Sequence, residues 1–262
     1  MPHGPSVAAG PQTLGCAPIR RVQTQGSGTI VADLDFDQFK EIVSVSKTDI
    51  CTTLYRQNRD LIRIKKEHVA VRNLVRIIDS TLRLANAKGF TGMTLRDLCT
   101  DAGLSMGGLY AYIRNKDDLV GLIQSHGFML TRRTLHDFTR DVDDPHEKLH
   151  VAVKSHLFLS ELMRPWFYFS YMEARHLAQS RKRDAVAIER ETERVYHDII
   201  AEGIEAGAFR PVDARLLASL IKAMLQDWYL KRGKYHDQGT SVTTYAETMR
   251  EVLERYLQHA PA

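Results

Sequence analysis

The sequence predicts an all-α protein of two parts, and three observations support that class. No stretch shows the strict alternation of apolar and polar residues that marks a half-buried strand. Three helix start signals follow one another between Met93 and Leu119. Beyond Leu119 the chain has the pattern of helices throughout, over residues 116–141, 145–162, 165–178, 180–206, 213–232 and 241–259. We therefore expect a small N-terminal helical domain followed by a larger helical bundle.

The composition of the 262-residue chain is that of an ordinary globular protein, with 44% hydrophobic and 26% charged residues. The three cysteines lie far apart, so neither a disulfide framework nor a CxxC metal site is expected. No apolar run is long enough for a membrane span, and the N-terminus lacks the pattern of a signal peptide. These features predict a soluble, cytoplasmic protein.

The N-terminal third is expected to contain a tail and an extension before the first domain. Residues 1–29 are rich in Pro, Gly, Ser and Gln, which predicts a disordered tail. Residues 30–67 are expected to form a helical extension, in which Asp35 caps a short helix. A second helix is expected to start at Thr48 or Asp49 and to turn four apolar residues inward: Ile50, Leu54, Leu61 and Ile64.

Basic residues are concentrated between residues 56 and 88, which include a predicted amphipathic helix over 68–88. Three acidic residues oppose nine basic ones there, although the net charge of the whole chain is only +4. The basic residues are Arg56, Arg59, Arg63, Lys65, Lys66, Arg72, Arg76, Arg83 and Lys88. Such a local surplus indicates a surface for a polyanion better than the total charge does.

Cap residues predict two short helices joined by a tight turn. Thr94 is a candidate cap for the first, with Asp97 completing a capping box. Gly103 can end that helix in the left-handed conformation. Ser105 then caps the second helix, and Asn115 caps the helix that follows. This is the helix-turn-helix pattern, whose second helix enters the major groove of DNA.

An ordered set of short motifs runs through residues 68–121. The set comprises Ile78, Ala85, Gly89-Phe90, Thr94-Leu95-Arg96-Asp97-Leu98, Ala102-Gly103-Leu104-Ser105, Leu109-Tyr110-Ala111-Tyr112, Lys116 and Leu119. At this spacing it resembles the DNA-binding domain of the TetR/AcrR family of bacterial transcriptional regulators. The resemblance implies a three-helix helix-turn-helix domain over 68–121, and a ligand-binding and dimerisation bundle over 122–262.

The same resemblance implies roles for individual residues. The helix from Ser105 to Ile113 would enter the major groove, and the hydroxyls of Tyr110 and Tyr112 would bond backbone phosphates. Lys116 would pair with a further phosphate at its helix start. The candidate DNA-binding residues are Thr94, Arg96, Ser105, Met106, Gly107, Gly108, Tyr110, Tyr112 and Lys116. Arg96 could either contact a phosphate or simply be a solvated side chain, and the sequence leaves both possibilities open.

Two positions depart from the family pattern. Met106 stands where Lys is usual and Gly108 where Thr or Ser is usual, so two phosphate contacts are lost. Met106 can instead touch a thymine methyl group. Gly107 and Gly108 each weaken the helix by about 1 kcal/mol relative to Ala, which predicts a pliable recognition helix that becomes ordered on DNA. The basic extension either replaces the lost contacts or is a solvated helix face.

The C-terminal part carries the features of a sensor and a dimer. The resemblance places dimerisation in the last two helices, over 213–232 and 241–259. The aromatic stretch 165–172 predicts a helix that is buried on several sides or lines a pocket. The candidate ligand-binding residues are Trp166, Phe169, Met172, Arg175, Met224 and Trp228.

The C-terminal half is also similar to fatty-acyl-CoA-responsive members of the family. The similarity lies in Met172-Glu173-Ala174-Arg175, Ile204-Glu205-Ala206-Gly207-Ala208-Phe209, Asp213-Ala214-Arg215-Leu216, Trp228 and Lys234-Tyr235. It implies a small apolar effector such as a fatty acyl-CoA, whose phosphates would meet Arg175, Arg181, Lys182 or Arg183. We expect a homodimeric repressor that this effector releases from operator DNA.

Two alternatives remain open at this point. One is a metal-responsive regulator, since His146 and His150 lie one helical turn apart and the fold could bring His136 and His156 close to them. The other is a helical protein-interaction module that binds no DNA. The chain has no Gly-rich phosphate loop after a strand, no GxSxG motif and no HExxH motif, so no enzyme and no cofactor is expected.

Overall fold

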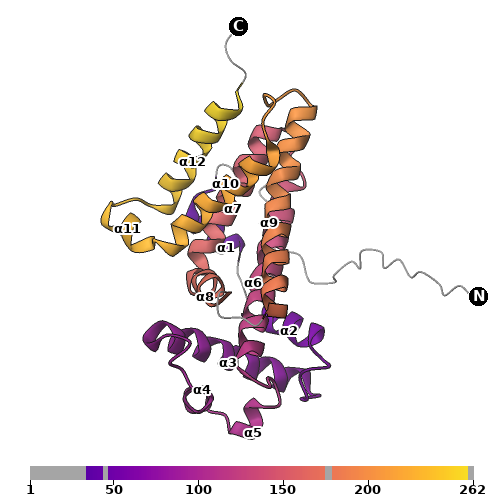
Figure 1. Ribbon diagram of the computed structural model, residues 1–262, viewed down its shortest axis with the longest axis vertical. Coiled ribbons are helices and arrows are strands. Elements are labelled where there is room, and N and C mark those ends of the chain that lie inside the picture. Colours follow the sequence, from indigo (N-terminus) through magenta and orange to yellow (C-terminus); the bar gives the residue numbers. More distant parts are fainter. Residues whose placement is uncertain (1–33, 44–46, 175–178, 259–262) are drawn as a thin grey trace, which may run out of the picture.

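The computed structural model describes residues 34–43, 47–174 and 179–258, and the secondary structure in these ranges is entirely helical. This confirms the all-α class, while the predicted tail over 1–29 lies outside the described residues. The small domain is built on α3 (Glu67–Lys88), α4 (Leu95–Ala102) and α5 (Met106–Leu109). In Figure 1 it lies at the lower end, and α6 (Lys116–Thr139) rises from it into the bundle above.

The N-terminal extension contacts both parts of the molecule. Asp35 caps α1 (Phe36–Ile42) as predicted. The ring of Phe39 packs against Phe138 of α6 and Phe158 of α7 (Pro145–Leu162), with centroids 5.4 Å apart in both pairs. The next helix, α2 (Lys47–Gln57), packs along α3 of the small domain. The extension therefore bridges the two parts.

The second helix of the extension is shorter than the apolar pattern predicted. It ends at Gln57, so Leu61 and Ile64 lie beyond it in a non-helical, half-buried segment. The side chain of Asn58 donates to the carbonyl of Leu54 (2.8 Å) just past the helix end. The chain then turns toward the start of α3 instead of continuing as a helix.

The bundle is organised around α7 (Pro145–Leu162), in which every residue from Leu149 to Ser160 is buried. A helix that is buried on all sides must have neighbours all round. They are α1, α6, α8 (Arg164–Ala174), α9 (Gln179–Glu205), α10 (Ala214–Leu230) and α12 (Val242–Leu257). Asp144, Asp213 and Ser241 cap α7, α10 and α12.

The aromatic helix α8 packs against several neighbours, as expected: α3, α6, α7 and α10. Trp166 and Phe169 are buried, whereas Tyr168 and Tyr171 are exposed. Their spacing gives α8 one inward face, as in an ordinary amphipathic helix. Between the last two predicted helices, 213–232 and 241–259, the chain forms a further short helix, α11 (Arg232–Asp237), which the sequence pattern did not predict.

Candidate DNA-binding surface and effector site

The helix-turn-helix is held by the caps that the sequence predicted. The Oγ1 of Thr94 accepts from the amide of Asp97 (3.1 Å), and the Asp97 carboxylate accepts from the amide of Thr94 (2.8 Å). The ammonium of Lys88, at the end of α3, is 2.6 Å from the same carboxylate. This ion pair and the Thr94 hydrogen bonds hold the pKa of Asp97 well below its usual range. The start of α4 is therefore tied to the end of α3.

The turn between α4 and α5 requires its glycine. Gly103 has a φ of +61°, in the left-handed region that L side chains rarely adopt. The guanidinium of Arg76 donates to the Gly103 carbonyl (3.1 Å) and would lie only 2.3 Å from an added Cβ. Any other residue here would strain the backbone and displace the arginine that joins the turn to α3.

The recognition helix is shorter than predicted. It was expected to reach Ile113, but α5 ends at Leu109 and is followed by tight turns. The amide of Tyr112 bonds the carbonyl of Leu109 (2.9 Å), three residues back, instead of continuing the α-helical pattern. The low helix propensity of Gly107 and Gly108 agrees with this early end.

The predicted DNA-binding residues fall into an exposed set and a buried set. Thr94, Arg96, Ser105, Gly107 and Tyr110 are exposed, and the side chain of Tyr110 is 43% accessible. Thr94 and Arg96 lie at the start of α4, whereas Ser105, Gly107 and Tyr110 lie at or within the ends of α5. The structure therefore leaves five of the nine candidates accessible on the helix-turn-helix.

The methionine and the second glycine of α5 are less accessible than expected. The Sδ of Met106 lies 3.3 Å from the Sγ of Cys99, so its half-buried thioether is turned toward α4. Gly108 is also half-buried, and its amide donates to the Oγ of Ser105 (3.0 Å) to complete the cap. Both residues contribute to the structure of the turn.

Tyr112 and Lys116 are engaged within the small domain. Tyr112 is only 1% exposed, its hydroxyl accepts from the Asn73 side chain (3.0 Å), and burial raises its pKa. The ammonium of Lys116 donates to the carbonyls of Met93 (2.7 Å) and Thr91 (3.3 Å). Partial burial lowers the pKa of Lys116. Unlike Tyr110, these two residues hold the domain together in the free protein.

The described ligand-binding candidates lie on α8 and α10, and two of them have defined aromatic contacts. Phe169 packs edge-on against Phe90 of the small domain, with centroids 5.2 Å apart. Trp228 packs against Tyr235 and Tyr245 near the C-terminus, and its indole N–H donates to Glu161 (3.1 Å). The first contact joins the two parts of the molecule and the second joins α10 to α11 and α12.

The remaining ligand candidates have varied positions. Trp166 is buried, whereas Met172 and Met224 are half-buried. Arg175 lies outside the described residues, and the side chains of Arg181, Lys182 and Arg183 are also outside them. A groove of 490 Å³ lies elsewhere, between α2 and α3, where Val71, Arg72 and Arg76 line part of it.

Sequence reasoning missed a buried polar group in the bundle. The Nδ1 of His156 is 2.7 Å from the hydroxyl of Tyr196, and both residues are fully buried. The Nε2 of His156 has no hydrogen-bond partner in the described structure. Lys222 of α10 is also buried, at 8% exposed, and burial lowers its pKa. Burial and the nearby charge of Lys222 lower the pKa of His156. Only the packing of α7, α9 and α10 brings these residues together.

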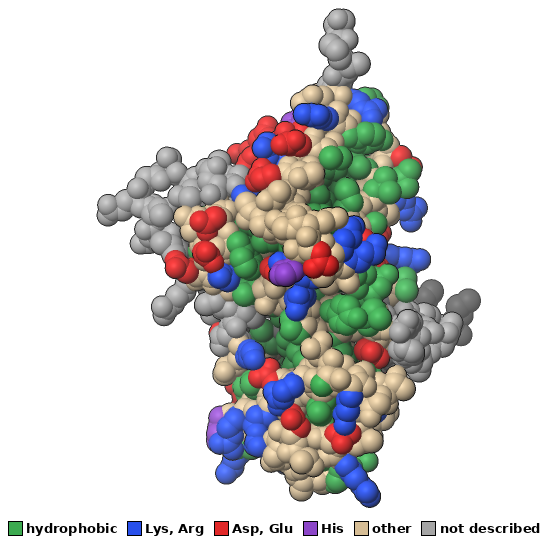
Figure 2. Space-filling view, turned by 90° about the vertical axis from the view of Figure 1, so that its left-hand side faces the viewer, with side chains coloured by type: hydrophobic (Ala, Val, Ile, Leu, Met, Phe, Trp, Pro, Cys, Tyr) green, Lys and Arg blue, Asp and Glu red, His purple; other side chains and the backbone are tan. Residues whose placement is uncertain are grey.

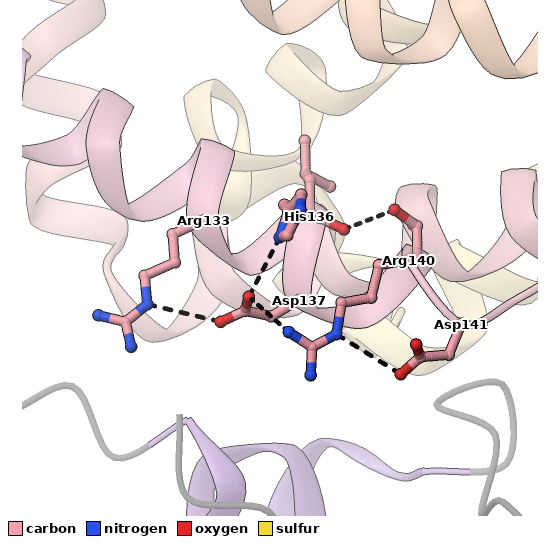
Figure 3. A network of polar contacts seen from close by, with 7 residues as sticks. Arg133, His136, Asp137, Arg140 and Asp141 are labelled. Atoms are coloured by element: carbon pink, nitrogen blue, oxygen red, sulfur yellow. Dashed lines mark hydrogen bonds and ion pairs between the residues drawn. The ribbon is translucent and has the colours of Figure 1, made fainter. Parts of the chain in front are cut away.

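The four histidines considered as metal ligands point to different partners. His136 lies beside Asp137, in a surface network with Arg133, Arg140 and Asp141 at the end of α6 (Figure 3). His146 contacts the carbonyl of Ala208, His150 lies beside Glu247, and His156 contacts Tyr196. The described residues hold no group of three His, Cys, Asp or Glu side chains that could bind a metal ion.

The outer surface differs between the two ends of the molecule. On the face in Figure 2, Lys and Arg side chains surround the lower end, while hydrophobic side chains are prominent over the C-terminal helices above. The exposed apolar residues of α10 and α12 are Leu216, Leu220, Val252 and Tyr256. None of the described helices is both long and apolar enough to cross a membrane.

Together these features define the class of protein. A capped helix-turn-helix with an exposed recognition helix, beneath a helical bundle, is the architecture of a DNA-binding transcriptional regulator. Two sequence profiles identify the family. Residues 77–123 match the profile for bacterial regulatory proteins of the tetR family, and residues 142–258 match the tetracyclin repressor-like C-terminal domain. The chain belongs to the TetR family of transcriptional regulators.

Individual relatives agree with this assignment. An uncharacterized HTH-type regulator, YfiR of Bacillus subtilis (strain 168), is 24% identical over 212 residues, or 75% of this chain and 97% of YfiR. A tetR-family regulator from Rhodococcus RHA1 has a TM-score of 0.65 and 21% identity, over 72% of this chain and 98% of that one. FadR of Bacillus subtilis, solved with stearoyl-CoA, has a TM-score of 0.61 and 19% identity, over 71% and 100% of the two chains.

Membership of this family decides between the classes left open above. TetR regulators are non-enzymatic DNA-binding transcription factors. The chain is therefore neither an enzyme nor a protein-interaction module without DNA binding.

Proposed function

We propose that this protein is an effector-responsive repressor that acts in the cytoplasm, and that Thr94, Arg96, Ser105, Gly107 and Tyr110 contact operator DNA. The observation that carries the DNA-binding part is the exposure of these residues on α4 and α5, the two helices on either side of the Gly103 turn. Met106, Gly108, Tyr112 and Lys116 support these helices. The DNA-binding domain covers residues 68–121, with the extension over 30–67 before it and the bundle over 122–262 after it.

The dimer of this proposal forms through α10 and α12. Four large apolar side chains on these helices are exposed in the single chain, and Leu216 and Leu220 are 58% and 52% accessible. Leu216 and Leu220 lie four residues apart on α10, as Val252 and Tyr256 do on α12, so each pair shares one helix face. Because each side chain is already about half buried, covering the rest of it with a second copy contributes roughly 1 kcal/mol. Two DNA-binding domains held this way would meet half-sites about 34 Å apart.

The effector in this proposal is a small molecule with a large apolar part, such as a fatty acyl-CoA. The fold similarity to FadR of Bacillus subtilis with stearoyl-CoA supports this chemistry by analogy. In this chain, Phe169 of α8 packs against Phe90, next to the start of α4. A ligand that displaced α8 would therefore change how the bundle supports the small domain. Its coupling energy is the difference in its affinity for the two conformations.

A DNA-binding assay tests the repressor proposal. The purified protein is titrated onto the DNA upstream of its own coding region, with a matched shuffled sequence as control. We expect tighter binding to the upstream DNA, and release when palmitoyl-CoA is added. Octanoic acid and free coenzyme A separate the contributions of the acyl chain and the nucleotide. Equal affinity for both DNAs would contradict an autoregulatory operator, and unchanged binding with palmitoyl-CoA would contradict the acyl-CoA effector.

A further inference from the structure

The end of the N-terminal extension is held against the exit of the recognition helix. The amide of Arg63 donates to the carbonyl of Ala111 (2.8 Å), two residues beyond α5. The preceding Ile62 is 3% exposed, so the segment is anchored by burial as well. The hydroxyl of Tyr55 contacts the carbonyls of Ile64 (2.9 Å) and Lys65 (3.1 Å). Residues 62–65 are thus fixed beside the DNA-binding surface.

This anchored segment carries cations that are not engaged by acids. Arg63, Lys65 and Lys66 are exposed, and their side chains have no ion pair among the described residues. Arg72, in the second turn of α3, is likewise exposed, and the side chain of the adjacent Asn73 donates to the hydroxyl of Tyr112 (3.0 Å), three residues past α5. Arg72 therefore lies near the turn that follows α5. In contrast, the charge of Arg56 is neutralised by Glu67, with Nη2 2.8 Å from the carboxylate.

The helix-turn-helix itself has little free positive charge for DNA. Between residues 91 and 116 its only cations are Arg96, Arg114 and Lys116. Arg114 pairs with the buried carboxylate of Asp118 (3.1 Å), and Lys116 is bonded to backbone carbonyls. Arg96 is the one cation of this described segment without such a partner. Because neutralising phosphates supplies most of the sequence-independent affinity for DNA, further cations are needed.

We propose that Arg63, Lys65, Lys66 and Arg72 form a phosphate-binding strip that extends the helix-turn-helix along the DNA backbone. The strip replaces the contacts that are missing at Met106 and Gly108. Its partner is the phosphate backbone of double-stranded DNA, so it adds affinity without reading sequence. The extension positions the strip through the Arg63 and Tyr55 hydrogen bonds. This inference rests on DNA binding by the chain and assigns part of that binding to residues outside the helix-turn-helix.

The double variant Arg63→Gln, Lys65→Gln tests the strip. Binding of the full-length protein to a short random-sequence duplex is measured over a series of salt concentrations. A contact with one phosphate contributes about 0.9 to the slope of log K against log salt. We therefore expect the slope to shrink by about 2, and affinity near physiological salt to fall on the order of tenfold. Both side chains are exposed, so the thermal unfolding midpoint should match that of the wild type.

The control removes the same charge from the far part of the molecule. Arg190→Gln, Arg194→Gln changes two exposed residues of α9 and lowers the net charge by the same amount. We expect its salt slope to remain that of the wild type. If the Arg63 and Lys65 variant keeps the wild-type slope, or loses no more affinity than the control, the strip does not exist. If the wild type itself binds neither this duplex nor its upstream DNA, DNA binding fails together with the strip.

Discussion

The ammonium of Lys116 lies 4.5 Å from the centroid of the Phe90 ring. The same ring packs edge-on against Phe169 of α8, so one aromatic side chain contacts both the start of α6 and the bundle. Lys116 also bonds the carbonyls at the end of the loop between α3 and α4. A residue expected to contact phosphate is therefore part of the junction between the two domains.

Replacing Lys116 with Met should destabilise the free protein. The variant keeps an apolar chain but loses a charged donor to the carbonyls of Thr91 and Met93. We expect the free energy of unfolding to fall by about 2 kcal/mol in urea titrations, because hydrogen bonds to charged groups contribute about 1.5–3 kcal/mol. The matched control is Lys65→Met, since the Lys65 side chain is exposed. Equal midpoints for both variants would show that Lys116 has no structural role.

The change Gly107→Ala should stabilise the recognition helix. An added Cβ at Gly107 meets no atom within 4 Å, so the gain in helix propensity of about 1 kcal/mol is not opposed by a clash. At Gly108 the Oγ of Ser105 would be 3.2 Å away, so Gly108→Ala should gain less. Urea unfolding measures both changes.

Amide exchange tests whether the wild-type helix is pliable. We expect upstream DNA to slow amide exchange in α5 of the wild type. Without DNA, exchange in α5 should be slower in the Gly107→Ala variant than in the wild type. The physical reason is that two successive glycines leave the short helix with more conformational freedom to lose. Exchange that is equally slow with and without DNA in the wild type would contradict a pliable helix.

Acid should destabilise the bundle through His150. Burial lowers the pKa of His150 to about 4, from an ordinary value of 6.5, although Glu247 lies 3.6 Å away. Between these two values the unfolded chain binds more protons than the folded one, so stability falls as the pH falls. From pH 7 to pH 5 we expect a loss of about 2 kcal/mol from this group.

A substitution separates His150 from the other titrating groups. His150→Gln should flatten the pH dependence of the urea midpoint over that range. Burial and the Lys222 charge lower the pKa of His156 as well, so some dependence in the same direction should remain. A wild-type midpoint that is constant from pH 7 to pH 5 would contradict both histidine assignments.

The proposed dimer can be disrupted at its exposed apolar face. Leu220→Glu places a charge on a side chain that is 52% accessible in the single chain, so the fold should survive. We expect light scattering to show a shift from dimer to monomer, with a loss of operator affinity because the two half-sites are no longer bound together. Val186→Glu, on α9, is the control at a comparably exposed position. A variant that remains dimeric would place the interface elsewhere.

Local signals in the sequence determined much of the fold. Thr94, Ser105 and Asn115 were predicted as caps from residue type and spacing, and all three accept the expected backbone amide. Gly103 was predicted in a left-handed conformation for the same reason. Such signals act within one helical turn, so they can be recognised without knowing the fold. The helix-turn-helix follows from them.

Tertiary contacts decided what local patterns left open. The recognition helix ends at Leu109, and the carbonyl of Ala111 just beyond it bonds Arg63 of the extension, 48 positions earlier in the chain. The hydroxyl of the buried Tyr112 accepts from Asn73 of α3, 39 positions earlier in the chain. The pairing of His156 with Tyr196 spans 40 positions. Sequence periodicity does not specify these partners, because it shows which face of a helix is apolar but not which helix covers it.

The DNA-binding segment shows the same division. Its amino acids by themselves determined two short capped helices and the glycine turn between them, because caps and left-handed glycines depend on neighbouring residues. The packing of α2, α3 and α8 around that segment decided that Lys116 turns inward and that Arg63 lies beside the exit of α5. The physical reason is that a long side chain takes the partner that the assembled fold brings within reach.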